Sequence, residues 1–198
     1  MRLPQLFWIF LLTATTSLFA NVKNGEHAPD FTLKNTQGEE VSLHDYEGKY
    51  VVLEWVNPGC PFVQKHYNSG NMQKLQAKAE GMDVVWLSIN STSPKSGDYL
   101  DASASSKWYQ EHDVKSQWLL DPEGKASKAY GAVRTPHMFI INPQGNVIYQ
   151  GAIDSINSAD PADIEKADNY VMDALKEATD GKNVSIAQTR PYGCTVKQ

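Results

Sequence analysis

The sequence predicts a single α/β domain, in which a mixed central β-sheet is flanked by helices and a β-hairpin lies at the N-terminal end. Apolar runs typical of buried strands, at residues 51–56 and 83–89, are each followed by a helical pattern. Right-handed crossovers turn such an alternation into one sheet with helices on both faces. Of the 198 residues, 41% are hydrophobic and 21% are charged, which suffices for one domain with a buried core.

Short local patterns predict the order of the elements. Residues 30–33 and 41–43 alternate around a turn at Gly38, which predicts the hairpin. A break at residues 68–71 divides the first helical stretch, and Gly81 is placed to end it. The other expected elements are helices over 61–67, 72–80, 99–112, 124–130 and 161–179, and strands over 117–120, 138–141 and 147–149.

Charge and cysteine content exclude several classes of protein. The 18 basic and 23 acidic residues give a formal net charge of -5, which argues against sequence-independent nucleic-acid binding. Two cysteines are too few for a small disulfide-stapled scaffold. The proportion of apolar residues is too high for a disordered chain.

The first twenty residues predict an export signal. A short cationic start at Arg2 precedes an apolar run at residues 6–12, and Ala20 offers a small residue for cleavage. The run is too short to span a bilayer, so no stable membrane anchor is expected. We expect residues 1–20 to be a signal peptide and residues 21–198 to be one periplasmic or extracellular domain, whose cysteines meet an oxidising compartment.

Cys60 is the strongest candidate for a reactive group. It lies between the buried strand at 51–56 and a helix whose first turn carries Pro61, a residue favoured at that position. The free amides and the positive dipole end of a helix N-terminus stabilise a thiolate, and Lys65 and His66 lie one to two turns further on. The alternative is a buried, inert cysteine.

Five motifs carry a resemblance to a known family. They are Ala28-Pro29-Asp30-Phe31, Gly59-Cys60-Pro61-Phe62, Tyr130-Gly131 followed by Thr135-Pro136, Asn142-Pro143-Gln144-Gly145, and the terminal Gly193-Cys194-Thr195-Val196-Lys197. Together they resemble the thioredoxin-like superfamily and, within it, the peroxiredoxin-like branch of the alkyl hydroperoxide reductase and thiol-specific antioxidant group. The resemblance covers about residues 26–197 and implies a thioredoxin-like fold.

The resemblance implies roles for three further residues. Thr135-Pro136 is similar to the family's cis-proline site, which faces the reactive cysteine and leaves backbone groups of Thr135 free to hold a substrate. Glu54 is similar to the buried acid by which thioredoxins relay protons. A desolvated carboxyl there has a raised pKa and can accept a proton from an attacking thiol; the alternative is a carboxyl paired elsewhere.

Two departures from the family pattern bear on peroxide chemistry. Position 63 is Val, so the two-cysteine motif of thioredoxins is absent. Typical peroxiredoxins carry Thr or Ser at the place of Asn57 and Pro at the place of Leu53. Asn57 remains a candidate hydrogen-bond donor, and Arg134 a candidate positive charge near the sulfur or, alternatively, a solvated loop cation.

Cys194 is the only other cysteine, and three interpretations stay open. It resolves a sulfenic acid on Cys60 by forming a disulfide, it forms a static disulfide with Cys60, or the two thiols are distant.

The leading functional hypothesis is a peroxiredoxin-like thiol oxidoreductase without a cofactor. The Cys60 thiolate reduces a hydroperoxide, Cys194 resolves the product, and an external thioredoxin-like dithiol resets the pair. The first alternative is thiol-disulfide exchange on proteins across Thr135-Pro136. The second is a non-enzymatic metal-binding or interaction module that uses Cys60 and His137. The catalytic candidates are Cys60, Cys194, Glu54 and Arg134, and the substrate-binding candidates are Thr135, Pro136 and Asn57. Oxidant, reductant and oligomeric state stay open.

Overall fold

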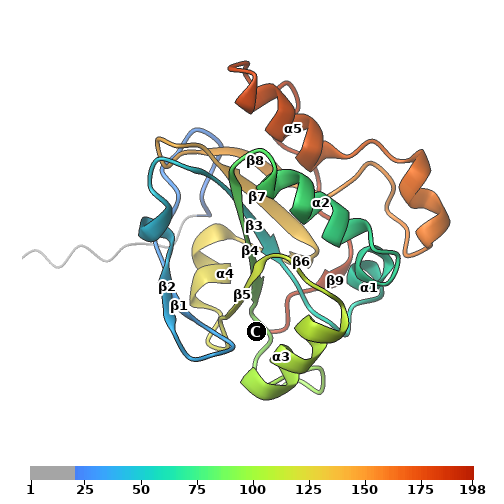
Figure 1. The fold of residues 1–198 in the computed structure, drawn as a ribbon. Helices are drawn as coiled ribbons and strands as arrows, with labels where there is room; N and C mark the ends of the chain where they lie inside the picture. Colours follow the sequence, from blue (N-terminus) through green and yellow to red (C-terminus); the bar gives the residue numbers. More distant parts are fainter. Residues whose placement is uncertain (1–20) are drawn as a thin grey trace, which may run out of the picture.

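The computed structural model describes residues 21–198, and the expected signal peptide lies outside the described residues (Figure 1). A seven-stranded sheet in the order β2-β1-β5-β4-β3-β7-β8 forms its centre. The inner strands β3, β4 and β5 run parallel, and the other neighbours pair antiparallel. The strands are β1 (Thr32–Asn35), β2 (Glu40–Ser42), β3 (Tyr50–Trp55), β4 (Val84–Asn90), β5 (Gln117–Leu120), β7 (His137–Ile141) and β8 (Val147–Gly151). The predicted mixed sheet with its N-terminal hairpin is confirmed.

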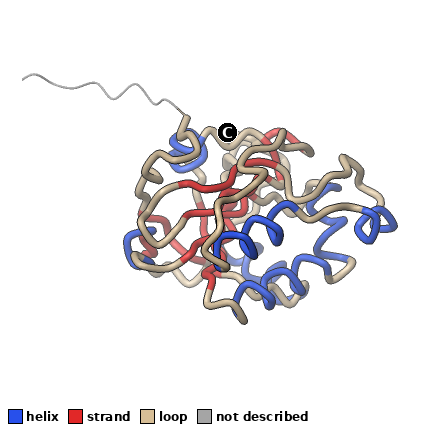
Figure 2. The backbone as a smooth tube through the Cα atoms, turned by 90° about the horizontal axis from the view of Figure 1, so that it is seen from above, coloured by secondary structure: helices blue, strands red, loops and turns tan. Residues whose placement is uncertain are grey.

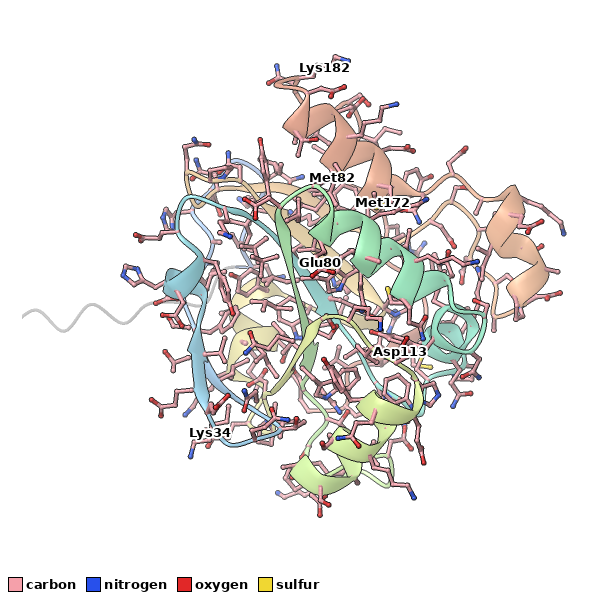
Figure 3. The ribbon with its side chains drawn as sticks, viewed as in Figure 1. Lys34, Glu80, Met82, Asp113, Met172 and Lys182 are labelled. Atoms are coloured by element: carbon pink, nitrogen blue, oxygen red, sulfur yellow. The ribbon has the colours of Figure 1, made fainter. Side chains whose placement is uncertain are left out.

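Helices cover both faces of the sheet, as Figure 2 shows. One face is covered by α1 (Pro61–Asn68), α2 (Asn71–Glu80), α3 (Ala102–Glu111) and α5 (Tyr170–Thr179), and the other by α4 (Lys125–Tyr130) and the 3-10 turn η1 (Leu43–Tyr46). Because side chains alternate along β3, Val52 packs in the core beneath α1, α2, α3 and α5, and Leu53 packs in the core beneath α4 and η1. Figure 3 shows Met82 and Met172, which pack at the margin of the core beneath α1, α2, α3 and α5.

The last predicted helix is wrong as a continuous element. Residues 161–179 divide into the 3-10 helix η2 (Pro161–Lys166) and α5. Asp168, which lies between them, is joined to Ser155, before η2, by two hydrogen bonds of 3.0 and 2.9 Å. Asn169 then begins α5 by accepting a hydrogen bond from the backbone of Met172. These tertiary contacts and the new cap interrupt the helical pattern.

A second, two-stranded sheet was not predicted. In it β6 (Arg134–Thr135) pairs antiparallel with β9 (Cys194–Thr195), and Figure 1 shows the two beside the start of α1. Strands of two residues leave no periodic pattern in a sequence. This pairing brings the C-terminal segment back to the start of α1.

No helix between residues 21 and 198 is both long enough and apolar enough to cross a membrane.

Candidate active site

Cys60 is the residue from which α1 starts. Its backbone is extended, Pro61 follows in the first turn, and the Cys60 carbonyl accepts hydrogen bonds from the amides of Val63 (3.0 Å) and Gln64 (2.9 Å). Its side chain is 1% exposed, and Sγ donates to the carbonyl oxygen of Thr135 at 3.1 Å. The sulfur therefore lies at the N-terminal end of a helix, buried, and in contact with the second sheet.

The loop before Cys60 is held by its own hydrogen bonds. The Asn57 Oδ1 accepts from the amide of Gly59 at 2.8 Å, and the Asn57 carbonyl accepts from the amide of Cys60 at 3.0 Å. The side-chain oxygen of Asn57 thus positions the loop, and its predicted role toward a substrate stays a prediction.

Thr135 connects the two cysteines. The peptide bond between Thr135 and Pro136 is cis, as expected. Thr135 pairs in register with Cys194, and its carbonyl oxygen accepts from Cys60 Sγ. The backbone groups expected to await a substrate are thus occupied by the chain's own C-terminal segment. The buried Thr135 hydroxyl, by contrast, has no hydrogen-bond partner among residues 21–198.

Cys194 lies against Cys60, and both are free thiols. Burial raises the pKa of Cys194 to about 12, and a side-chain hydrogen bond with Cys60 is the second cause. The interpretation of two distant thiols is therefore wrong. A raised pKa keeps Cys194 as a thiol at neutral pH, so it is a weak nucleophile in this state.

Gly193 is required for this close approach. Its φ is +105°, and a Cβ built there would lie 2.2 Å from the Thr135 carbonyl oxygen and 3.4 Å from the Cβ of Phe62. Any other residue would push the segment away from Thr135, and Cys194 with it.

The segment after Cys194 supplies the cation near the sulfurs. Lys197 forms an ion pair with Asp98, which is the first cause of its raised pKa, and the two cysteines contribute to the same shift. The Lys197 carbonyl accepts from the amide of Ser93 at 2.6 Å. The sequence motif contained Lys197, but nothing in the pattern placed it beside Cys60, because the approach depends on the fold of the tail.

Arg134 precedes Thr135, and its Nη1 donates to Thr195 Oγ1 at 2.6 Å, on the neighbouring strand. Its role as a positive charge near the sulfur stays a prediction. The side chains of Lys65 and His66 lie against the carboxylate of Asp154.

Comparisons with known proteins identify the family. The AhpC/TSA family matches residues 24–150, well over half of the chain. The chain belongs to this family. The thiol-disulfide oxidoreductase ResA of Bacillus thuringiensis is 25% identical over 126 residues, 64% of this chain and 68% of that protein. A thiol peroxidase of Listeria innocua is 28% identical over 136 residues, 64% of this chain and 75% of that protein.

A solved structure extends the similarity over most of the chain. An uncharacterized conserved protein from Geobacillus kaustophilus superposes with a TM-score of 0.79 at 25% identity, covering 89% of this chain and 92% of that one. The fold of this AhpC/TSA-family chain is thioredoxin-like, and the protein is a thiol-dependent oxidoreductase, as predicted.

Glu54 occupies a polar pocket on the Cys60 side of the sheet in this AhpC/TSA-family chain. It is fully buried and accepts hydrogen bonds from Tyr67 (3.0 Å), Trp86 (2.9 Å) and Ser88 (2.9 Å). Burial raises its pKa to about 7, and the three donors oppose that shift. Cys60 is not among its hydrogen-bond partners, so the proton relay stays a prediction.

A second buried acid, Asp154, links α1 to the C-terminal segment. Lys65, whose side chain is 0% exposed, lies 3.3 Å from its Oδ2, and the Tyr192 hydroxyl donates to its Oδ1. His66 Nε2 lies 3.7 Å from Oδ2, but burial lowers the pKa of His66 to about 4, so the ring is neutral at pH 7. No local pattern indicates this cluster, because Lys65, Asp154 and Tyr192 are far apart in the chain.

His137 does not form a site with Cys60. Its ring lies 4.6 Å from that of Phe139, which packs in the core on the opposite face of the sheet, and Nδ1 accepts from the amide of Val133 at 3.4 Å. Burial lowers its pKa to about 3. Between residues 21 and 198, no three His, Cys, Asp or Glu side chains are grouped to hold a metal ion. The alternative of a Cys60–His137 metal module stays a prediction, and these contacts of His137 give it no support.

Proposed function

We propose that Cys60 and Cys194 are the redox pair of this oxidoreductase and alternate between two thiols and one disulfide. One observation carries the proposal: Thr135 accepts a hydrogen bond from Cys60 Sγ and pairs in register with Cys194, so a single residue holds both cysteines together. The two side chains also lie within hydrogen-bonding reach of each other, which is the proximity that a disulfide requires.

The proposed oxidant is a hydroperoxide, and Cys60 is the nucleophile. Cys60 lies at the N-terminus of α1, where the helix dipole favours an anionic group, whereas burial raises the pKa of Cys194 to about 12. The thiolate attacks the outer peroxide oxygen, an S–O bond forms, the O–O bond breaks, and the alkoxide leaves with a proton as alcohol. Because Cys60 is only 1% exposed, a small oxidant suits the site better than a folded protein.

Cys194 completes the oxidation. Its sulfur attacks the Cys60 sulfenic acid, the S–S bond forms, and the Cys194 proton and the sulfenic hydroxyl leave as water. An external dithiol then reduces the disulfide by exchange and becomes a disulfide itself. The step needs no cofactor.

Thiol-disulfide exchange is the second candidate, and the similarity to the thiol-disulfide oxidoreductase ResA of Bacillus thuringiensis favours it. Exchange needs only a thiolate: Cys60 attacks a substrate disulfide and expels one thiolate, and Cys194 then displaces the second.

Stoichiometric oxidation tests both candidates. Reduced protein is mixed with one equivalent of hydrogen peroxide or of a small disulfide, and intact mass is followed with time. We expect a Cys60–Cys194 disulfide that forms faster than free cysteine is oxidised, and a sulfenic acid on Cys60, trapped by dimedone, in Cys194→Ser. If Cys60→Ser is oxidised at the same rate as the parent protein, the proposal fails. If only the small disulfide reacts readily, the second candidate replaces the first.

We propose that the protein is exported and that residues 21–198 are its mature domain. The cationic start, the short apolar run and Ala20 support a cleaved signal. Intact mass of the protein recovered from outside the cytoplasm is expected to begin near residue 21. Retention of residue 1 in that fraction would exclude a cleaved signal.

A further inference from the structure

A cavity of about 600 Å³ lies beside the redox pair. Its wall includes Phe62, two residues after Cys60, Arg134, next to Thr135, and Gly193, next to Cys194. Gly193 approaches both Phe62 and Thr135, and Arg134 precedes Thr135 in the chain. A molecule bound in this cavity is therefore held within two residues of each part of the proposed catalytic unit.

We infer that this cavity binds a small organic molecule that carries carboxylates, which is the substrate or the reductant of the redox pair. The inference rests on the proposed function only for the reaction of the bound molecule with the redox pair. The volume of the cavity falls within the range of about 300–1,000 Å³ that is typical of small-molecule sites.

The charges of the cavity select an anion. Arg134 and Arg190 both line it, and neither guanidinium forms an ion pair with an acid of residues 21–198. Arg134 has one hydrogen bond, to the neutral hydroxyl of Thr195. Two uncompensated arginines thus face one cavity in a protein whose net charge is -5.

The acid of the cavity does not cancel this positive charge. Asp154 is the only acidic residue in the lining, it is 4% exposed, and Lys65 lies 3.3 Å behind it. Its other oxygen accepts from Tyr192. With Asp154 neutralised by Lys65, the cavity keeps the charge of its two arginines.

The remaining walls favour an organic acid over an inorganic ion. Phe62 and Tyr192 pack at a centroid distance of 5.8 Å, and both line the cavity together with Tyr170. Aromatic side chains stabilise the carbon skeleton of a ligand, while guanidinium groups bind carboxylates through two parallel hydrogen bonds. Two arginines suit a molecule with two carboxylates.

Binding of an unreactive probe tests the inference separately from the redox chemistry. S-methylglutathione carries two carboxylates and has no thiol, so it cannot exchange with either cysteine. Isothermal titration calorimetry on the reduced, full-length mature protein is expected to show saturable binding of this probe. Its dimethyl ester, which has the same skeleton without carboxylates, is expected to bind at least about 10-fold more weakly.

Variants assign the binding to the cavity. Arg190→Gln is expected to weaken S-methylglutathione about 3- to 10-fold and to leave the ester unchanged, because the side chain removed acts through its charge. Lys182→Gln, which removes an exposed cation beyond the end of α5 (Figure 3), is the matched control and is expected to change neither affinity.

Three results would overturn the inference: no binding of the probe, equal affinity for acid and ester, or inorganic phosphate competing as well as the organic acid. None of these depends on whether Cys60 reacts. Conversely, a protein that binds the acid through Arg190 but forms no Cys60–Cys194 disulfide would support the cavity and refute the proposed function.

Discussion

Two buried carboxylates on the α1 side of the sheet are held in opposite ways. Glu54 is surrounded by the neutral donors Tyr67, Trp86 and Ser88, whereas Asp154 faces the buried ammonium group of Lys65. The same helix serves both acids, since Tyr67 and Lys65 are two residues apart in α1.

The difference shows how far neutral hydrogen-bond donors can offset the burial of a carboxylate. Hydrogen bonds from Trp86, Ser88 and Tyr67 lower the pKa of Glu54, but burial outweighs them and the pKa rises to about 7. Glu54 therefore takes up a proton near neutral pH. Asp154 has a cation as its partner and also accepts from Tyr192, so it links the helix that begins at Cys60 to the segment that carries Cys194.

Removing the cation is expected to have the largest effect. Lys65→Met leaves Asp154 buried without an opposite charge, which costs about 3–5 kcal/mol of the free energy of unfolding. The double variant Lys65→Met with Asp154→Asn is expected to recover much of the loss, because Asn still accepts from Tyr192. Urea unfolding of both variants measures this.

Lys166→Met is the matched control, since Lys166 pairs with Asp163 at the surface. We expect no measurable change in its unfolding midpoint. If Lys65→Met unfolds at the same urea concentration as this control, the ion pair with Asp154 does not stabilise the fold.

The second prediction concerns the acid without a cation. The folded-state pKa of Glu54, about 7, lies above its ordinary value, so the folded protein binds more protons than the unfolded chain between the two values. Stability therefore falls as pH rises across this window, by about 3 kcal/mol in total, and is constant above it. Glu54→Gln is expected to abolish this part of the pH dependence.

Urea unfolding at about pH 5 and at about pH 8 measures the second prediction. The parent protein is expected to gain stability on acidification relative to Glu54→Gln. Glu80→Gln, at an exposed carboxyl on α2 (Figure 3), controls for the substitution itself and is expected to keep the parent's pH dependence. Parallel curves for the parent protein and Glu54→Gln would show that Glu54 stays ionised.

Local pattern predicted the elements that build the sheet and the position of Cys60. The apolar run at 51–56 and Pro61 fix the strand and the helix start, so the turn that carries the sulfur follows from neighbouring residues. Glu54 was identifiable for a similar reason, as a charged residue within an apolar strand.

What the sequence did not reveal depends on contacts between distant segments. The strand of Cys194 is two residues long and exists because Gly193 fits against Thr135. In the sequence Lys65 is an ordinary lysine of a predicted helix, because its partner Asp154 lies 89 positions further along the chain. No local periodicity encodes such a pairing.

The third prediction breaks the link between Asp154 and the C-terminal segment. Tyr192→Phe keeps the ring on Phe62 and removes only the hydroxyl that donates to Asp154. We expect a loss of about 1–2 kcal/mol in the free energy of unfolding. With Cys194 held less firmly, the Cys60–Cys194 disulfide is expected to be reduced more easily, by about 2- to 10-fold in its equilibrium with glutathione.

Tyr50→Phe is the control for this third prediction. It removes a hydroxyl that donates to the Ala178 carbonyl at 2.9 Å, from the start of β3. Both variants are expected to lose stability, but only Tyr192→Phe is expected to change the thiol-disulfide equilibrium. A change of equal size in both would assign the effect to general destabilisation.

The smallest effect is expected at the exposed counterpart of the buried pair. Lys197 and Asp98 also form an ion pair next to the redox site, but water screens it, so Lys197→Gln is expected to leave the unfolding midpoint unchanged. Lys197 does oppose the rise in the pKa of Cys194, and its loss is expected to slow alkylation of that thiol by about 2- to 3-fold at pH 8. The rate is measured in Cys60→Ser, where Cys194 is the only thiol, with Lys182→Gln as the control for removal of a distant cation. A rate unaffected by Lys197→Gln would mean that the ion pair with Asp98 fully compensates the lysine, and that the exposed pair, unlike Lys65 and Asp154, influences neither the fold nor the thiol chemistry.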